Sequence, residues 1–339
     1  MAGDVLLPSA TGHKQIQTYI YEALGLYNPV VYRVFGSSRY FTAIEIAKTM
    51  LAISGEDKFD NIVVACGQEF PDALTGTYLA TQKGAPILLV DKGYEKMVSE
   101  FIAANMAADG TIYVLGDAKA VSTDIEASLK AVGNVKRVAG TSRYRTNLEI
   151  LKETNATSGE LLVTTGVSAW DSLSASGSNC PILLIQENGT LRDDQKAYLA
   201  AADFSRITII GDEAAVPATM EAELAAFCSD INRVGAKGRY NTSVAVAEYF
   251  YGDHNENVVL AFGQKFPDGL CGGPLAAMIG APVVLAEDAR EVIDNYVKQA
   301  YIGVVLGGEG DKGSQITDAE VVDIFELFSA SDIIANPYK

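Results

Sequence analysis

Short apolar runs alternate along this chain with longer stretches in which apolar residues recur at a helical spacing. A run such as Ile62–Cys66 is continuously apolar, which is typical of a strand buried on both faces of a parallel sheet. Between such runs, Pro71 suits the first position of a helix and Gly84 suits its end. The pattern predicts an α/β protein with right-handed crossovers between parallel strands. One predicted helix has the apolar face Ala43, Ile46, Ala47, Met50 and Leu51.

The pattern occurs three times at a period of roughly 100 residues, with five landmarks in the same order. Each copy opens with two arginines six residues apart, and the second arginine is followed by Tyr-x-Thr. A second apolar run ends in glycine and leads to an aromatic residue and an aspartate. A third run begins with proline, and a fourth ends in glycine. The openings are 33–42, 137–146 and 233–242; the second runs are 62–67, 161–166 and 258–263; the third are 86–89, 181–184 and 282–285; the fourth are 112–116, 207–211 and 304–307.

Four strands per copy predict three domains that each read β-α-β-α-β-α-β-α. We place these domains at 32–132, 133–229 and 230–330. Residues 1–31 precede the first copy, and we expect a helix there after a disordered start. Copy two has ten residues from its aspartate to its proline, whereas the other copies have fourteen. Because this difference is close to one helical turn, we expect a shorter helix with the same buried face.

The composition fits a packed protein of two or three domains, since 48% of the 339 residues are hydrophobic. No apolar stretch approaches the ~18 residues that cross a membrane. The formal charge of −17 argues against nucleic-acid binding, which depends on basic patches. Surface charge is screened beyond about 8–10 Å, so a local pocket can still bind an anion. The first residues lack a secretory signal, as in a cytosolic protein or in a fragment whose signal has been removed.

The residue types that carry most catalytic chemistry are rare here, and we predict no enzyme, cofactor or metal site. The two histidines, His13 and His254, stand at unrepeated positions without a nucleophile elbow. Residues 308–313 match Gly-x-Gly-x-x-Gly, but the other copies lack these glycines, so a surface turn is the favoured interpretation. The four cysteines form no CxxC pair and are interpreted as small buried residues: Cys66, Cys180, Cys228 and Cys271.

At its repeated residues the chain resembles the cell-wall-binding repeat type 2 family of Gram-positive surface proteins, from about Tyr32 to Ile324. Copy one carries the family's Gly-x-x-Phe-Pro-Asp-Ala-Leu and Ala-Pro-Ile-Leu-Leu segments at 67–74 and 85–89. Copy two departs at Asn147, where alanine is usual. The resemblance implies three tandem Toprim-like, doubly wound domains in a pseudo-threefold arrangement. Each would be a mostly parallel four-stranded sheet flanked by helices.

The resemblance also implies non-covalent attachment to an anionic secondary wall polysaccharide or a teichoic-acid-like polymer at the cell surface, without catalysis or membrane insertion. Modules of this family usually accompany an effector domain, which we expect to lie outside this chain. Two alternatives stay open. One is a structural or adhesive surface protein that acts through protein–protein assembly, and the other is an enzyme that handles a nucleotide or a sugar phosphate.

Residues in two repeated loops are candidates for binding the polymer. Parallel sheets bind ligands at the carboxyl ends of their strands, so the loops after the first and second strands should meet at one edge. Arginine there suits phosphate or carboxylate, although an arginine paired with aspartate would serve the fold equally well. The tyrosines can stack on sugar rings or cap the core. The candidates are Arg39, Tyr40, Asp72, Arg143, Tyr144, Asp171, Arg239, Tyr240 and Asp268.

The proline-led third runs are a further candidate set. Their pattern alone predicts core strands, whereas the family resemblance associates them with polymer recognition, either directly or by shaping a groove between domains. The first arginines of the copies, Arg33, Arg137 and Arg233, partly offset the acidic surround, and a bridging divalent cation is the alternative. The third runs comprise Pro86, Ile87, Leu88 and Leu89; Pro181, Ile182, Leu183 and Leu184; and Pro282, Val283, Val284 and Leu285.

Overall fold

A computed structural model of the chain describes residues 29–186, 189–286, 290–298, 300–310, 315–327 and 329–338. Most of the extension 1–31, where a helix was expected, lies outside these residues, while Val30 and Val31 belong to a strand. Within the described ranges the chain forms three parallel sheets flanked by helices, which confirms the predicted fold class. No helix in these ranges is long and apolar enough to cross a membrane.

The first sheet contains the last three strands of copy one and the first strand of copy two. Its strands are β2 (Phe59–Cys66), β3 (Ile87–Val90), β4 (Met106–Leu115) and β5 (Asn134–Val138). They are parallel, in the order β3-β2-β4-β5. The helices of this domain are α2 (Arg39–Ser54), α3 (Pro71–Gln82), α4 (Glu95–Asn105) and α5 (Thr123–Lys130).

The second sheet has the same construction. Its strands are β6 (Ser158–Thr165), β7 (Ile182–Ile185), β8 (Asp203–Ile210) and β9 (Ile231–Val234). They are parallel, in the order β7-β6-β8-β9, and β9 comes from copy three. The helices are α6 (Arg143–Glu153), α7 (Trp170–Ala175), the 3₁₀ turn η2 (Ser176–Ser178), α8 (Asp193–Ala200) and α9 (Thr219–Leu224).

The third sheet is built from both ends of the described chain. Its strands are β10 (Asn257–Phe262), β11 (Val283–Ala286), β12 (Ile302–Leu306), β1 (Val30–Val34) and β13 (Ile333–Ala335). They are parallel, in the order β11-β10-β12-β1-β13. The helices are α10 (Arg239–Tyr251), η3 (Gly269–Cys271), α11 (Gly272–Met278), α12 (Arg290–Val297), α13 (Asp318–Ile324) and η4 (Ala330–Asp332).

The three sheets are offset by one strand from the three sequence repeats. The first strand of each copy pairs with the fourth strand of the preceding copy, as β5 does with β4 and β9 with β8. Copy one completes the cycle, because β1 pairs with β12 and aligns Val34 with Leu306. Each copy therefore contributes a strand to its neighbour, and the three domains form a closed ring.

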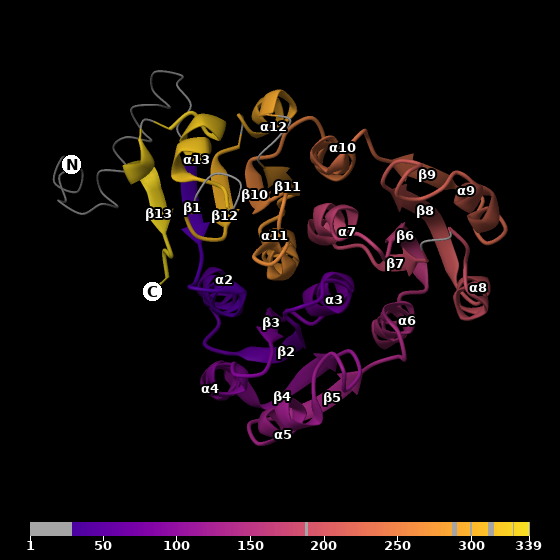
Figure 1. Ribbon diagram of the computed structural model, residues 1–339, viewed down its shortest axis with the longest axis horizontal. Coiled ribbons are helices and arrows are strands. Elements are labelled where there is room, and N and C mark those ends of the chain that lie inside the picture. Colours follow the sequence, from indigo (N-terminus) through magenta and orange to yellow (C-terminus); the bar gives the residue numbers. More distant parts are fainter. Residues whose placement is uncertain are drawn as a thin grey trace.

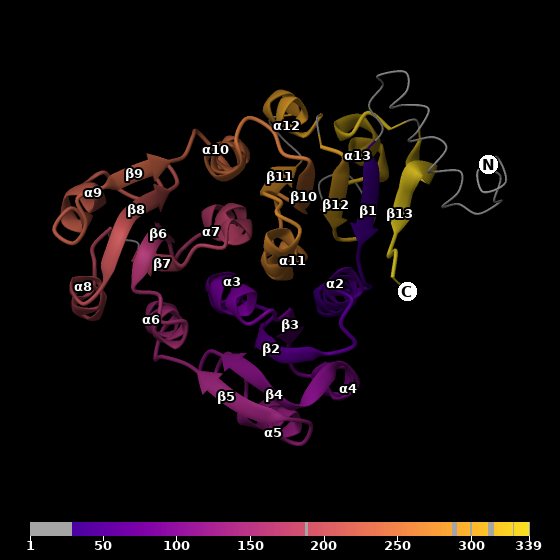
Figure 2. The ribbon, with the colours of Figure 1, turned by 180° about the vertical axis from the view of Figure 1, so that it is seen from behind.

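Figures 1 and 2 show this ring from its two sides. The helices α3, α7 and α11 lie at the centre, and the three sheets surround them. The helix pairs α4 with α5, α8 with α9, and α12 with α13 cover the outside of their sheets. The helices α2, α6 and α10 lie between neighbouring domains, where α6 packs against α3 and α10 against α7. The arrangement has the threefold character that the family resemblance implied.

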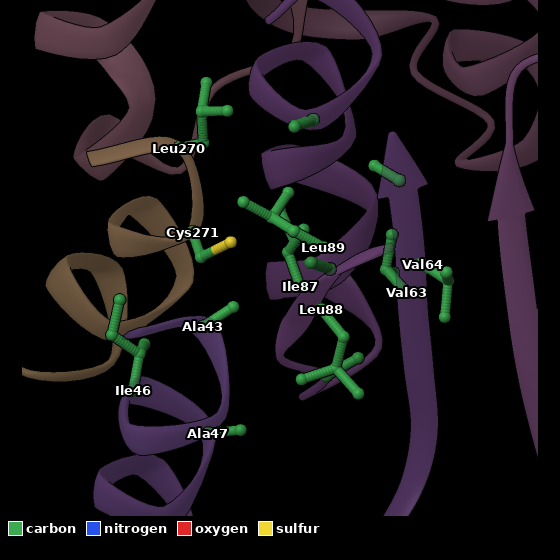
Figure 3. Packing of buried hydrophobic residues seen from close by; sticks show 14 of the residues in the cluster. Ala43, Ile46, Ala47, Val63, Val64, Ile87, Leu88, Leu89, Leu270 and Cys271 are labelled. Atoms are coloured by element: carbon green, nitrogen blue, oxygen red, sulfur yellow. The ribbon is translucent and has the colours of Figure 1, made fainter. Parts of the chain in front are cut away.

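The core runs continuously from one domain into the next. In Figure 3, side chains of α2, β2 and β3 gather in one apolar cluster with Leu270 and Cys271 of the third domain. The same cluster extends to Ala169 and Leu173 in the second domain. Because burying apolar surface contributes about 25 cal/mol per Å², this shared core holds the domains together as one body.

The predicted helix limits of copy one are confirmed. The helix α3 begins at Pro71, and the chain turns away at Gly84, whose φ of 57° lies in the left-handed region that glycine enters without strain. In copy two the corresponding helix α7 has six residues and continues into η2. The shorter helix expected from the missing four residues is thus present, with its buried face retained.

The departure at Asn147 has a structural reason. Its buried side chain donates a hydrogen bond to the Ile182 carbonyl, 2.7 Å, and accepts one from the Leu184 N–H, 2.9 Å. These backbone groups belong to β7, which is an edge strand of its sheet. In copy three, Ser243 accepts from the N–H of Leu285 at 3.0 Å in the same way. A polar residue here completes the hydrogen bonding of an edge strand that is buried.

Candidate functional site

The second arginine of each copy occupies the first position of a helix and is held in the same way in all three copies. The Nη1 groups of Arg39, Arg143 and Arg239 donate hydrogen bonds of 2.7, 2.8 and 2.9 Å to glycine carbonyls. These glycines end the second strand of the same copy and are Gly67, Gly166 and Gly263. Each arginine is half-buried, so its remaining N–H groups lie near the surface.

Each of these arginines also faces the preceding copy. The guanidinium carbon of Arg143 lies 5.5 Å from the ring centroid of Phe70, and that of Arg239 lies 4.1 Å from the ring centroid of Trp170. A cation over an aromatic face is attracted by the ring's quadrupole. The aromatic residues themselves gather at the centre of the ring, with centroid distances of 5.8 Å from Phe70 to Phe266 and 6.4 Å from Trp170 to Phe266.

The repeated aspartates lie at the same junctions, deep beside the glycine that ends the fourth strand. A Cβ atom on Gly116, whose φ is 91°, would stand 2.5 Å from Oδ2 of Asp72. The same carboxylate oxygen of Asp171 and Asp268 lies beside Gly211 and Gly307. Glycine is therefore required at this position both for its backbone conformation and for the space that the carboxyl group occupies.

Burial is the main influence on these carboxyl groups. It raises the pKa of Asp72 to about 6, and the charge of Arg143 opposes the shift. Burial likewise raises the pKa of Asp171 to about 6, against the charge of Arg239. For Asp268, burial raises the pKa, while a hydrogen bond with Thr42 and the charge of Arg39 lower it. Each aspartate thus responds to the arginine of the following copy.

The predicted convergence of the arginine and aspartate loops is therefore present, but it joins neighbouring copies. Arg143 meets Asp72 of copy one, and Arg239 meets Asp171 of copy two. Arg39 meets Asp268 of copy three, which closes the cycle. This relation follows from the strand offset, because the first strand and its arginine loop cross into the sheet of the preceding copy.

The repeated tyrosines mainly fill space in the loops. The rings of Tyr40, Tyr144 and Tyr240 each lie against the glycine that ends the second strand. Tyr40 is 5% exposed, stacks on Tyr94 with ring centroids 3.8 Å apart, and accepts a hydrogen bond of 2.9 Å from Gln68. The structure thus places Tyr40 among the core residues, whereas Tyr144 and Tyr240 are half-buried.

The structure does not bring the proline-led segments to the surface with the arginines. Their aliphatic residues form β3, β7 and β11, the strands at the inner edges of the three sheets, and are 0–2% exposed. β3 packs against α2, β7 against α6 and β11 against α10. These strands also contact the neighbouring domains, as α3 does with β7 and α7 with β11. Their side chains shape the junctions from within the core.

Among the described residues, pockets lie at the junction between copies one and two and at the junction between copies three and one. The pocket between copies one and two, called here the 1–2 pocket, has a volume of about 450 Å³. The pocket between copies three and one, the 3–1 pocket, has a volume of about 350 Å³. The charged residues lining the 1–2 pocket are Glu69, Asp72, Asp91, Asp117, Lys119 and Arg143, and those lining the 3–1 pocket are Arg39, Lys265 and Asp268.

Polar residues around these pockets, Lys265 and Glu69 above all, were not among the candidates predicted from the sequence. Both stand two residues after the glycine that ends the second strand, so their place in the repeat was readable. Repeated identities did not indicate them, because the three copies carry different residues at this position. At this position the copies differ in charge, so the two pockets differ in the charge of their lining.

The cysteines, the histidines and the glycine-rich turn were also subjects of prediction. Cys66, Cys228 and Cys271 are buried, as predicted, while Cys180 is half-buried and all four are free thiols. His254 is exposed, and His13 lies outside the described residues, as do residues 311–314 of the glycine-rich turn. Across the described ranges, no group of three or more His, Cys, Asp or Glu side chains is arranged to hold a metal ion.

These observations define a class of protein: a ring of repeated α/β domains with candidate binding sites between the copies. The family model for cell wall binding domain 2 (CWB2) matches residues 33–126, 137–221 and 233–316. These segments are most of the chain, and the chain belongs to this family. The resemblance noted from the repeated residues is therefore confirmed.

Two curated relatives come from Bacillus subtilis (strain 168). The N-acetylmuramoyl-L-alanine amidase LytC is 25% identical over 252 residues, which are 73% of this chain and 48% of the relative. The amidase enhancer is 27% identical over 281 residues, which are 80% of this chain and 36% of the relative. The chain thus spans half or less of the length of these relatives.

Two solved structures share the fold. Cwp8 from Clostridium difficile has a TM-score of 0.77 at 23% sequence identity, covering 95% of this chain and 56% of Cwp8. Cwp6 from the same organism also has a TM-score of 0.77 at 23% identity, covering 89% of this chain and 48% of Cwp6. At this level of identity the likeness supports the arrangement of three α/β domains.

Proposed function

We propose that this chain is a non-enzymatic anchoring module, which holds a protein on the Gram-positive cell wall by binding an anionic secondary wall polymer between its domains. Membership of the CWB2 family supports the wall as its partner and the cell surface as its location. The observation that carries the site is the guanidinium group that each copy extends over the preceding copy. It occurs three times with the same carbonyl contact.

The geometry suits such a ligand for a physical reason. Each arginine donates one hydrogen bond to a glycine carbonyl, and in two junctions an aromatic ring lies near the guanidinium group. The side chain is thereby fixed before a ligand arrives, which reduces the entropy lost on binding. Its other N–H groups can pair with two oxygens of a phosphate or carboxylate. Repetition around the ring lets one polymer chain engage more than one junction, which increases avidity.

A sedimentation experiment tests the proposal. The protein is mixed with purified Gram-positive walls before and after hydrofluoric acid removes the phosphodiester-linked polymers, and the bound fraction is measured. We expect binding to intact walls and its loss on stripped peptidoglycan. Binding that persists on stripped peptidoglycan would contradict the proposal. Formation of an ordered lattice by the protein in the absence of walls would favour the alternative of a structural surface protein.

Arg39→Gln tests the site, since it removes a charge from the 3–1 pocket and keeps much of the side-chain volume. Arg145→Gln is the matched control, because Arg145 is exposed, pairs with Asp194 at 3.2 Å and lies outside both junction pockets. We expect weaker wall binding for Arg39→Gln and unchanged binding for Arg145→Gln. Equal losses in the two variants would argue against a site at the junction.

A further inference from the structure

The three junctions differ at one position of the repeat. Two residues after the glycine that ends the second strand, copy one has Glu69, copy two has Ser168 and copy three has Lys265. Glu69 and Lys265 line the 1–2 pocket and the 3–1 pocket respectively. Both side chains are exposed, so neither identity is imposed by packing in the core. The position therefore sets the charge of the junction without altering its framework.

In the 1–2 pocket, acidic groups outnumber basic ones. The carboxylate of Glu69 lies 3.4 Å from the guanidinium group of Arg143, the candidate binding arginine of this junction. Asp91 and Asp117 line the same pocket as Asp72 and leave Lys119 as its second cation. An anion entering this pocket would have to displace Glu69 from Arg143 and would meet further negative charge. Such like-charge contacts oppose binding.

In the 3–1 pocket the balance is reversed. Among the described residues that line it, Arg39 and Lys265 are the cations and Asp268 is the single acidic residue. Asp268 is largely buried and accepts a hydrogen bond from Thr42, so its charge is partly satisfied within the protein. Within the described ranges, neither Arg39 nor Lys265 forms a salt bridge. Both cations are thus available to a ligand.

The loop before α2 also supplies neutral donors to the 3–1 pocket. Ser38 lines it, and its buried hydroxyl oxygen has no hydrogen-bond partner among the described residues. The equivalent Ser142 of copy two accepts a hydrogen bond of 3.4 Å from the N–H of Arg145 and so caps its own helix. Ser37 lines the 3–1 pocket beside Ser38. Hydroxyl groups next to two cations match the oxygens of a phosphate or carboxylate.

We infer that the three junctions are not equivalent and that this chain takes the anionic group of its wall polymer chiefly in the 3–1 pocket, through Arg39 and Lys265. This inference rests on the proposed function and deepens it. Lys265 selects an anion at this junction, whereas Glu69 disfavours one at the junction between copies one and two. Polymer binding then depends on a junction that the chain forms only when β1 joins the third sheet.

Charge reversals at matched positions test the inference. Lys265→Glu and Lys58→Glu change the net charge equally, and both lysines are exposed, but Lys58 lies outside both junction pockets. Affinity for purified Gram-positive walls is measured by sedimentation at 50 and 200 mM NaCl, and thermal unfolding confirms that each variant is folded. We expect Lys265→Glu to lower the affinity about tenfold at low salt and to reduce its salt dependence. Lys58→Glu should stay within about twofold of the unmodified chain.

A third variant, Glu69→Lys, should raise the affinity about threefold, since it frees Arg143 and adds a cation to the 1–2 pocket. Equal losses in Lys265→Glu and Lys58→Glu would overturn the inference, because net charge would then explain both. Intact binding by Lys265→Glu would overturn it while leaving the proposed function standing. Failure of the unmodified chain to bind intact walls would instead contradict the proposed function itself.

Discussion

The two arginines that open each copy stand six residues apart and recur with equal regularity, yet the fold uses them differently. The first arginine is ion-paired with the preceding copy, and its side chain is fully buried in Arg33 and 19% exposed in Arg137 and Arg233. Arg33 is 2% exposed, donates a hydrogen bond of 3.0 Å to the Gly307 carbonyl and pairs with Asp318 at 2.8 Å. In the same way, Arg137 pairs with Glu126 and Arg233 with Glu221. The second arginine stays half-exposed at a pocket or an aromatic ring.

The carboxyl groups beside the two arginines show what this difference means. Hydrogen bonds from Lys130 and Arg137 lower the pKa of Glu126, so the charged form of this partner of Arg137 is stabilised by two cations. Burial raises the pKa of Asp72 to about 6 in spite of the nearby Arg143. The second arginine is thus only loosely paired. Both residues recur in the sequence, but their electrostatic environments separate the structural arginine from the arginine that we propose as a ligand-binding residue.

Removing the buried arginine should produce the largest effect on stability. Arg33→Ala leaves Asp318 and the Gly307 carbonyl without their partner, so we expect the free energy of unfolding to fall by about 3 kcal/mol. Urea denaturation followed by circular dichroism measures this change. Arg39→Ala is the matched control and should cost less than about 1 kcal/mol. Similar losses in the two variants would remove the distinction between the two arginines.

Stability should change with pH in opposite directions for the carboxyl group beside the second arginine, Asp72, and the carboxyl group beside the first arginine, Glu126. The pKa of Asp72 is about 6 in the folded state and near its ordinary value of 3.8 in the unfolded state. Between these two pKa values the folded state binds more protons than the unfolded state. The contribution of Asp72 to the free energy of unfolding therefore rises by up to about 3 kcal/mol as the pH falls from 7 to 4. We therefore expect Asp72→Asn to stabilise the protein at pH 7.5 and to flatten this part of its pH profile.

Glu126→Gln provides the opposite case. Because the pKa of Glu126 is lowered, its contribution to stability is present above its unfolded pKa and is lost as the pH falls through its folded pKa. Glu126→Gln should therefore cost more stability at pH 7 than at pH 3. Thermal melting of both variants from pH 3 to 8 measures the two slopes. If the change in melting temperature relative to the unmodified chain varied with pH in the same direction for both variants, the different environments inferred for Asp72 and Glu126 would be contradicted.

The smallest expected effect concerns the shape of the guanidinium group. Arg239→Lys keeps the charge but loses a flat cation 4.1 Å from the centroid of Trp170, which should cost about 0.5–1 kcal/mol of stability. Arg39→Lys keeps the charge in the 3–1 pocket and serves as the comparison. A larger loss for Arg39→Lys would show that stacking on Trp170 contributes little. Denaturant midpoints resolve differences of this size.

Local features of the fold were predictable because local sequence determines them. Pro71 and Gly84 set the limits of α3, and the continuous apolar run at 62–66 identified a strand buried on both faces. The missing four residues of copy two correctly indicated a shorter α7. The family resemblance supplied what these patterns do not contain, namely the arrangement of three domains around a common centre.

Strand order was not predictable, because it depends on pairing between distant segments. The apolar run of β1 has the same character whether it joins β2 or β12, and only the folded ring shows the second pairing. The short strand β13 has three residues and carried no signal in the apolar pattern. The cross-copy meeting of Arg143 with Asp72 was hidden for the same reason. Which residues share a site followed from topology and not from the repeated motif.

The place of β1 between β12 and β13 has a consequence for biosynthesis. A ribosome releases β1 before every other described strand, but both neighbours of β1 in the sheet are among the last strands to be made. The third sheet therefore cannot be completed before β12 and β13 have been synthesised, and its closure pairs segments as far apart in the sequence as Val30 and Ile302. Contacts of such long sequence separation slow folding. Until that pairing forms, β1 lacks both of its neighbours in the sheet.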